Sequence, residues 1–259
     1  MPLELVSPAE IAKEKVLAVQ EYAELAWRSV TNLFRQPRYV ADMLLQADNI
    51  GVGSLPIVIL TGFFTGAVLA LNTSSTLEKF GSLSLTGQLV SVSMVRELGP
   101  VLTGLLVAGR NASGMASELG SMKVTEQIDA MRALGTDPYK KLVTPRVAAT
   151  VVMLFFLSII SDLVGLCGGW FISYALLGLD SYQYWTTSYQ TLAYADVIMG
   201  LVKPIFFGFL ISTVGCYYGM STTGGTQGVG RSTTQAVVAA SVLILVVDFF
   251  LTRFLMVVL

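Results

Sequence analysis

The 259-residue chain contains no histidine, only two cysteines and few charged residues, which make up 13% of it. Without histidine, catalytic triads and dyads that use an imidazole base are excluded. Two cysteines alone cannot supply the ligands of a usual zinc site. Cys167 and Cys216 also fall in apolar segments, where small packing residues are expected. The sequence therefore predicts a non-catalytic chain without a metal or another cofactor, and its net charge of −1 gives no indication of nucleic-acid binding.

Long apolar runs determine the class of the protein. Hydrophobic residues make up 54% of the chain, and a helix needs about 20 apolar residues to cross a bilayer. We predict an all-α integral membrane protein in two parts: residues 1–47 as an N-terminal amphipathic interfacial helical segment, and residues 48–259 as a five-helix transmembrane domain. The predicted spans are 50–72, 86–109, 147–177, 195–219 and 233–258.

The N-terminal segment has an apolar stripe at helical spacing but no spanning run. The stripe consists of Ala12, Val16, Val19, Ala23, Ala26, Val30 and Phe34. Trp27, Arg28, Arg35 and Arg38 favour a helix that lies on the membrane surface, and packing on a partner is the alternative. Pro37 is expected to end the helix.

Basic residues predict the orientation. The N-terminal segment, residues 110–146 and residues 220–232 together hold 12 of the 16 lysines and arginines (5, 6 and 1). The two opposite loops, 73–85 and 178–194, hold only Lys79. By the positive-inside rule, the N-terminus is cytoplasmic and the C-terminus lies on the other side.

Glycine pairs four residues apart occur in three of the spans, at Gly62/Gly66, Gly165/Gly169 and Gly215/Gly219. Such pairs let helix backbones approach closely. They suit packing within the chain or a seam between two copies of it.

Five charged residues fall inside the predicted spans: Arg96, Glu97, Asp162, Lys203 and Asp248. Each costs about 2.5–3.5 kcal/mol at the centre of a helix on insertion scales, so it is expected to face the protein interior or a wet cavity. Two are basic and three acidic. Ion pairing between helices and a polar cavity lining are both open interpretations.

The segment 110–146 contains a short predicted helix at 125–134, with Thr125 as its cap and Gly135 after its end. Ile128, Met131 and Leu134 share one side of it. A surface helix with apolar residues among charges suits a groove on another protein, and folding against its own chain is the alternative.

Residues 225–232 (GTQGVGRS) imitate a phosphate-binding P-loop. Arg231 stands where that motif requires lysine, and an apolar helix rather than a strand precedes it. We reject the motif and expect a tight turn between the last two spans. ATP, if used, must be bound by another chain.

Three blocks of residues resemble the MlaE/YrbE family of permeases, and the similarity runs from about residue 50 to the end. They are 96–102 (RELGPVL), 118–131 (ELGSMKVTEQIDAM) and 228–234 (GVGRSTT). The resemblance implies a homodimeric permease of the bacterial inner membrane that moves phospholipid between that membrane and the outer envelope. It also implies cytoplasmic ABC ATPase subunits, a periplasmic assembly of MCE (mammalian cell entry) domains and often a STAS-domain subunit.

The resemblance further assigns roles to residues. Arg96, Glu97, Lys203 and Asp248 fall on charged cavity positions of the family, and Leu69, Leu77 and Phe80 fall where its first span lines a lipid pocket. The second block contains the helix that couples to the ATPase, with Glu126, Ile128, Asp129, Met131 and Arg132. The competing hypothesis is an ion-coupled secondary transporter of a hydrophobic substrate that uses Glu97, Asp162 or Asp248 as proton sites. Such carriers usually contain internal repeats, which this sequence does not show.

Overall fold

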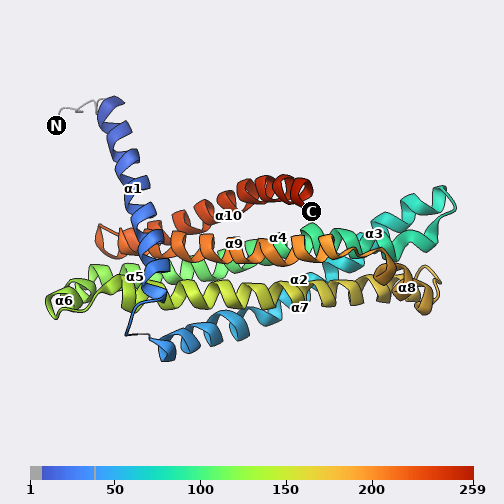
Figure 1. The fold of residues 1–259 in the computed structure, drawn as a ribbon, viewed down its shortest axis with the longest axis horizontal. Helices are drawn as coiled ribbons and strands as arrows, with labels where there is room; N and C mark the ends of the chain where they lie inside the picture. Colours follow the sequence, from blue (N-terminus) through green and yellow to red (C-terminus); the bar gives the residue numbers. More distant parts are fainter. Residues whose placement is uncertain (1–7, 38) are drawn as a thin grey trace.

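The computed structural model describes residues 8–37 and 39–259, and over these residues it consists of helices and turns, without a β-strand (Figure 1). One short helix, η1, is of the 3₁₀ type, and three, η2 to η4, are π turns within longer helices. In chain order the elements are α1 (Pro8–Leu33), α2 (Val40–Lys79), η1 (Leu83–Leu85), α3 (Thr86–Ser93), η2 (Met94–Leu98), α4 (Gly99–Val107), η3 (Ala108–Ala112), α5 (Ser113–Val124), α6 (Gln127–Ala133), η4 (Tyr139–Val143), α7 (Thr144–Ala175), α8 (Ser181–Thr191), α9 (Tyr194–Met220) and α10 (Gly225–Val258).

Five helical stretches of the described chain are long and apolar enough to cross a membrane, which confirms the five predicted spans. They are Val40–Lys79, Leu83–Val124, Tyr139–Ala175, Tyr194–Met220 and Gly225–Val258. The first has 40 residues, or about 60 Å of helix, against about 30 Å of hydrocarbon. The helices therefore extend beyond the apolar runs from which they were predicted, and the expected boundary at residues 47 and 48 falls inside α2.

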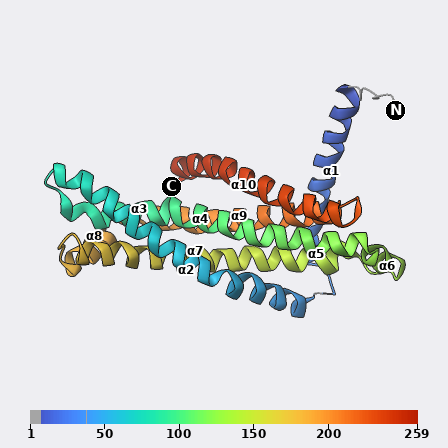
Figure 2. The same cartoon turned by 180° about the vertical axis from the view of Figure 1, so that it is seen from behind.

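The spans form an elongated bundle with distinct ends, as Figures 1 and 2 show. α1 and α6 lie at one end, and α8 lies with the start of α3 at the other. Ser188 of α8 donates a hydrogen bond to the carbonyl of Gly87 in α3, at 3.0 Å. Asp180 caps α8 by accepting from the backbone N–H of Gln183. This helix was not predicted from the sequence, because its residues are mostly polar and form no apolar run.

The glycine pairs serve packing within the chain. A Cβ on Gly66 of α2 would lie 1.8 Å from the carbonyl oxygen of Gly165 in α7, and one on Gly168 would lie 2.0 Å from that of Phe63. Gly219 of α9 similarly faces Leu119 of α5. The intramolecular interpretation is therefore confirmed for these pairs, which let backbones meet without an intervening side chain.

The predicted turn between the last two spans is shorter than expected. Residues 225–232 already belong to α10, and the chain reverses over residues 221–224. Gly224 and Gly225 have φ angles of 86° and 67°, which glycine adopts without steric cost. The expectation of a loop at 225–232 was wrong because helix-compatible residues follow the two glycines.

The N-terminal helix α1 ends at Leu33, four residues before Pro37. It contacts the bundle through Leu25, which is buried, and through a 2.9 Å hydrogen bond between the hydroxyls of Tyr22 and Thr213. Trp27 is 72% exposed. A position at the membrane surface remains a prediction for this helix.

Candidate functional site

Lys203 of α9 is the centre of a buried ionic cluster that joins three spans. Its Nζ lies 2.6 Å from Oε2 of Glu97 and 3.0 Å from Oδ1 of Asp248. It also donates a hydrogen bond to the carbonyl of Arg96, at 2.9 Å. Thr252 of α10 donates to the other carboxylate oxygen of Glu97, at 3.1 Å. One ammonium group thus connects the second, fourth and fifth spans.

This arrangement corrects the role that the sequence suggested for Lys203. The side chain is fully buried, and an ammonium group has three donors, which here face the oxygens of Glu97, Asp248 and Arg96. In this arrangement Lys203 cannot also reach a lipid phosphate. The side chains of Glu97 and Asp248 are 38% and 18% exposed, so the carboxylates form the outer side of the cluster.

Arg96 belongs to a second ion pair, with an acidic residue that the sequence analysis missed. Its Nε lies 3.0 Å from Oδ1 of Asp196, and its Nη2 lies 3.9 Å from the sulfur of Met199. Asp196 also accepts a hydrogen bond from the backbone N–H of Ala193 at the start of α9. An acidic residue in the first turn of a helix is ordinarily explained by the helix dipole, so its position alone gave no indication of a partner.

The π turn η2 directs three consecutive side chains to different neighbours. Arg96 faces Asp196, and Glu97 faces Lys203. Leu98 lines a pocket beside α2. π turns are frequent at functional sites because they change the direction of side chains along a helix. η2 is therefore the element that places the ionic cluster and the pocket next to one another along the second span.

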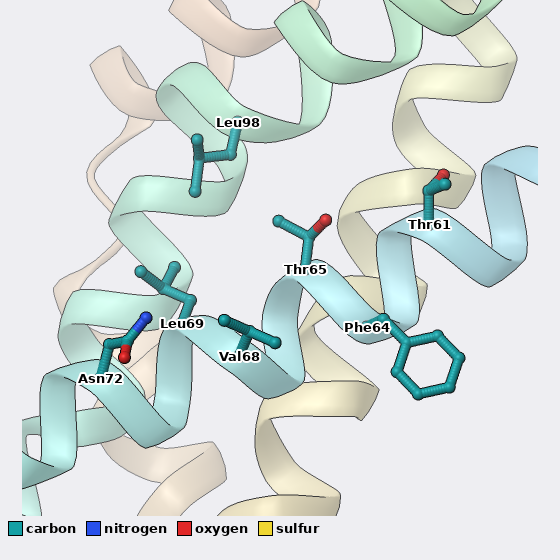
Figure 3. A pocket seen from close by; sticks show the side chains of 7 residues that line it. All are labelled: Thr61, Phe64, Thr65, Val68, Leu69, Asn72 and Leu98. Atoms are coloured by element: carbon teal, nitrogen blue, oxygen red, sulfur yellow. The ribbon is translucent and has the colours of Figure 1, made fainter.

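The pocket beside α2 has a volume of about 420 Å³ and a mostly apolar wall (Figure 3). Leu98 faces it from η2, and the remaining lining residues come from α2. They are Thr61, Phe64, Thr65, Val68, Leu69 and Asn72. Its size lies within the range of small-molecule sites, which are mainly apolar with a few polar groups.

Of the three pocket residues expected on α2, the structure brings only Leu69 to this pocket. Leu77 lies two turns further along α2, and Phe80 follows the end of the helix and is 76% exposed. None of the charged residues of the ionic cluster lines the pocket. Within one chain, the apolar wall of the pocket and the charged residues of the ionic cluster therefore lie on different sides of η2.

Asp162 of α7 remains apart from the cluster. It is 8% exposed, and its Oδ1 has no hydrogen-bond partner. It lines an apolar pocket of about 260 Å³ together with Val95 and Leu163. A Cβ at position 99 would lie 1.6 Å from this oxygen, so Gly99 provides its space. Pairing between helices, one of the two open interpretations, is found for Arg96, Glu97, Lys203 and Asp248 but not for Asp162.

The short helix α6 lies where the sequence predicted it, but its apolar side faces the chain itself. Ile128 is fully buried in a cluster with Leu119 and Leu142, so it cannot contact another protein. Leu134, which follows the helix, is 84% exposed. Thr125 does not cap α6, because its hydroxyl donates to the carbonyl of Ser121 in the preceding helix.

On the charged side of α6, Asp129 pairs with two basic residues. Its carboxylate accepts hydrogen bonds from Lys123, at 2.9 and 3.1 Å, and from Arg132, at 3.1 Å. The hydrogen bond from Lys123, followed by the nearby positive charges, lowers the pKa of Asp129. Glu126 precedes the helix in a left-handed conformation. Glu126, Asp129 and Arg132 are exposed, and Met131 is half-buried.

Over residues 8–37 and 39–259, no three histidine, cysteine, aspartate or glutamate side chains gather in a way that could hold a metal ion. The ionic cluster itself combines two carboxylates with an ammonium group. The Lys203 ammonium group lies within ion-pair distance of both carboxylates, which fits a structural or substrate-responsive role better than metal binding.

Comparison with known proteins gives one consistent family. The family model described as permease MlaE matches residues 43–254. A probable ABC transporter permease protein of Rickettsia typhi is 42% identical over 90% of both chains. One of Synechocystis is 39% identical over 82% of this chain and 80% of its own. The intermembrane phospholipid transport system permease protein MlaE of Haemophilus influenzae is 35% identical over 81% of both chains.

Proposed function

Since the chain belongs to the MlaE permease family, we propose that it is the membrane-spanning subunit of an ATP-driven ABC-type transporter of phospholipids. It is a multi-pass protein of the inner membrane and moves lipid between this membrane and the outer envelope. The related permeases of Rickettsia and Haemophilus support both the transporter class and the cargo.

The observation that carries this proposal is the pocket between α2 and η2. Its apolar wall suits an acyl chain, and its partly polar side chains Thr65 and Asn72 lie on the same helix face. The neighbouring carboxylates of Glu97 and Asp248 hold Lys203. A lipid that displaced one of these carboxylates would free the Lys203 ammonium group to bind the lipid phosphate. The cluster can therefore respond to substrate only by rearranging.

ATP is hydrolysed by a separate subunit in this proposal, because the phosphate-loop imitation at residues 225–232 forms the first turns of α10. The ATPase contacts this chain through α6, by Glu126, Asp129, Met131 and Arg132 together with the exposed Leu134. Ile128 contributes by holding α6 on the bundle. The chain itself is not an enzyme.

The assembly consists of two copies of this chain, two cytoplasmic ATPases, a periplasmic MCE-domain assembly and a STAS-domain subunit. The resemblance of the chain to the MlaE/YrbE family supports these partners. The N-terminus and α6 face the cytoplasm, and α8 faces the periplasm, in agreement with the basic residues at the α6 end. α1 acts as the interfacial segment, and the chain from α2 onward forms the permease domain.

A second candidate, a proton-coupled carrier, is favoured only by the unpaired Asp162 in its apolar pocket. It requires a carboxyl group that gains and loses a proton during transport. An Asp162→Asn variant that transports lipid at the normal rate with ATP excludes this candidate. Loss of transport with unchanged ATPase activity and assembly favours it.

Photo-crosslinking after purification tests the lipid proposal. A photoreactive amino acid replaces Leu98 or Leu69 in the pocket, and Val246 serves as a control because it is 46% exposed on α10 outside the pocket. The protein is freed of bulk lipid in detergent before illumination, and adducts are identified by mass spectrometry. We expect phospholipid adducts at Leu98 and Leu69 but not at Val246. Equal labelling at all three positions, or none in the pocket, contradicts the proposal.

A further inference from the structure

A second pocket lies between α2 and the second span, at the end of the bundle that carries α6. It has a volume of about 420 Å³, and its wall is about half polar. Its lining residues are Gln46, Asn49, Ile50, Arg110, Asn111, Gly114, Met115 and Glu118. The pocket lies where the apolar run of α2 begins, which is the level of lipid headgroups.

Arg110 is held in place on one side of this pocket. Its Nη1 donates to the carbonyl of Asn49, at 3.1 Å, and to the hydroxyl of Ser54, at 3.0 Å. A Cβ on Gly53 would lie 2.2 Å from Nη2 of Arg110, so the absence of a side chain there lets the guanidinium lie against α2. Among the described residues, Nη2 makes no hydrogen bond, and a planar guanidinium is suited to binding phosphate oxygens.

Asn111, the next residue, provides an independent indication of a ligand. It is 8% exposed and lines the pocket, and its amide nitrogen has no hydrogen-bond partner. Leaving a buried donor without a partner costs about 1–3 kcal/mol. Arg110 and Asn111 both belong to the π turn η3, an irregularity that is frequent at functional sites.

Glu118 adds the opposite charge. Its Oε2 accepts from Nη2 of Arg146, at 2.7 Å, and the Arg146 side chain is 5% exposed. Glu118 itself is 56% exposed, and its Oε1 accepts no hydrogen bond among the described residues. The pocket therefore offers a phosphate-binding side, with Arg110 and Asn111, and a carboxylate that can accept from an ammonium group.

We propose that this pocket binds the phosphoethanolamine-type headgroup of a phospholipid in the leaflet at the α6 end. Arg110 and Asn111 bind the phosphate, and Glu118 accepts from the primary ammonium group. The inference deepens the proposed function and rests on it for identifying the ligand as a membrane lipid. It adds a headgroup-selective site in the leaflet opposite the pocket at Leu98.

The acyl chains have a path along α2. Gln46, Asn49 and Gly53 share a helix face with Ile57 and Leu60, which are 44% and 57% exposed. From Asn49 to Thr61, the first lining residue of the other pocket, the helix rises about 18 Å. One leaflet of hydrocarbon is about 15 Å thick. A lipid with its headgroup at Arg110 therefore extends along α2 to within about 3 Å of the pocket at Leu98.

The test uses the full chain in nanodiscs that contain equal amounts of phosphatidylethanolamine, phosphatidylglycerol and phosphatidylcholine, without nucleotide. A photoreactive amino acid replaces Gln46. The matched control replaces Leu44, which is 68% exposed and lies about half a turn away on α2. We expect phosphatidylethanolamine adducts at Gln46 to exceed each of the other two lipids by at least about tenfold, the effect of one hydrogen bond to a charged group. Adducts at Leu44 should follow the bilayer composition.

Asn111→Leu is the informative variant, because its amide nitrogen makes no hydrogen bond that the fold would lose. It should lower the yield of phosphatidylethanolamine adducts at Gln46 toward the yield at Leu44, because the phosphate loses a hydrogen-bond donor, and it should leave the unfolding temperature unchanged or higher. An undiminished adduct yield at Gln46 in a folded Asn111→Leu protein overturns the role of this residue and, with it, the proposed site.

Other outcomes also decide the proposal. Adducts at Gln46 that follow the bilayer composition, favour phosphatidylglycerol or join a second copy of the chain overturn it. Abolition of the preference by soluble glycerophosphoethanolamine assigns the site to the free headgroup and overturns the lipid assignment. Lipid adducts at Leu98 without selectivity at Gln46 remove this inference alone, whereas their absence at both positions removes the proposed function as well.

Discussion

At the scale of single residues, Lys203 differs from Arg96 and Arg110 because its side chain is fully buried. Two carboxylates, those of Glu97 and Asp248, approach the same ammonium group from different spans. Without the ammonium group, these like charges would face each other in a region of low polarity. Removing one partner of a buried ion pair typically costs about 3–5 kcal/mol, because the remaining charge is uncompensated.

We therefore expect Lys203→Met to lower the free energy of unfolding by about 3–5 kcal/mol. Thermal unfolding of the purified protein in detergent measures the change. Arg28→Met is the matched control, since it removes an exposed ion pair with Glu24 that is worth at most about 1 kcal/mol. A Lys203→Met protein as stable as the control would show that the two carboxylates do not depend on the ammonium group.

Sequence reasoning identified the buried charges but not how they divide into pairs. The charges stood out because apolar spans surround them, whereas Asp196 and Thr252 looked like an ordinary helix start and an ordinary small polar residue. Which of Glu97, Asp162 and Asp248 reaches Lys203 depends on how the helices rotate about their axes. The π turn η2 changes that rotation, and no residue pattern in 94–98 indicated it.

At the scale of elements, the apolar runs predicted the existence of all five spans but not their full length. A helix continues past its apolar run wherever the following residues are compatible with it, as in residues 40–49 of α2 and 225–232 of α10. Composition marks the part of a helix inside hydrocarbon, whereas backbone hydrogen bonding determines where the helix ends. α8 was not predicted because hydropathy marks only helices with an apolar run, and α8 is polar.

The exposed and the buried side of α6 lead to opposite predictions for ATPase association and for stability. Leu134→Asp should weaken association with the ATPase while changing the stability by no more than about 0.5 kcal/mol, because Leu134 is exposed. Ile128→Ala should lower the stability by about 2–5 kcal/mol, because it empties a fully buried site. Co-purification with the ATPase and thermal unfolding of the chain alone separate the two effects. Full association of a Leu134→Asp protein would exclude this surface as a contact.

At the scale of the whole molecule, the two ends of the bundle differ in charge. Of the 15 basic residues in the described part of the chain, 11 belong to the segments at the end with α1, α6 and the α9–α10 turn, and the end with α8 carries Lys79 (Figure 1). This asymmetry is the physical basis of the predicted orientation.

Cysteine labelling tests the orientation in a Cys167→Ser background, since Cys167 is exposed and Cys216 is buried. In intact spheroplasts, an impermeant thiol reagent should label cysteines placed at Ser82 and Gln183, near α3 and α8. A cysteine at Ala133 of α6 should react only after the membrane is opened. Labelling of Ala133 in intact spheroplasts would reverse the topology.

The ionic cluster also constrains how the protein is made. α9 and α10 leave the ribosome in succession, joined by the four residues 221–224, and Asp248 makes α10 costly to insert alone, by about 2.5–3.5 kcal/mol on insertion scales. Lys203 of α9 is the partner that offsets this cost. We therefore expect the two helices to enter the bilayer together as a helical hairpin, so that biogenesis of the last span depends on the one before it.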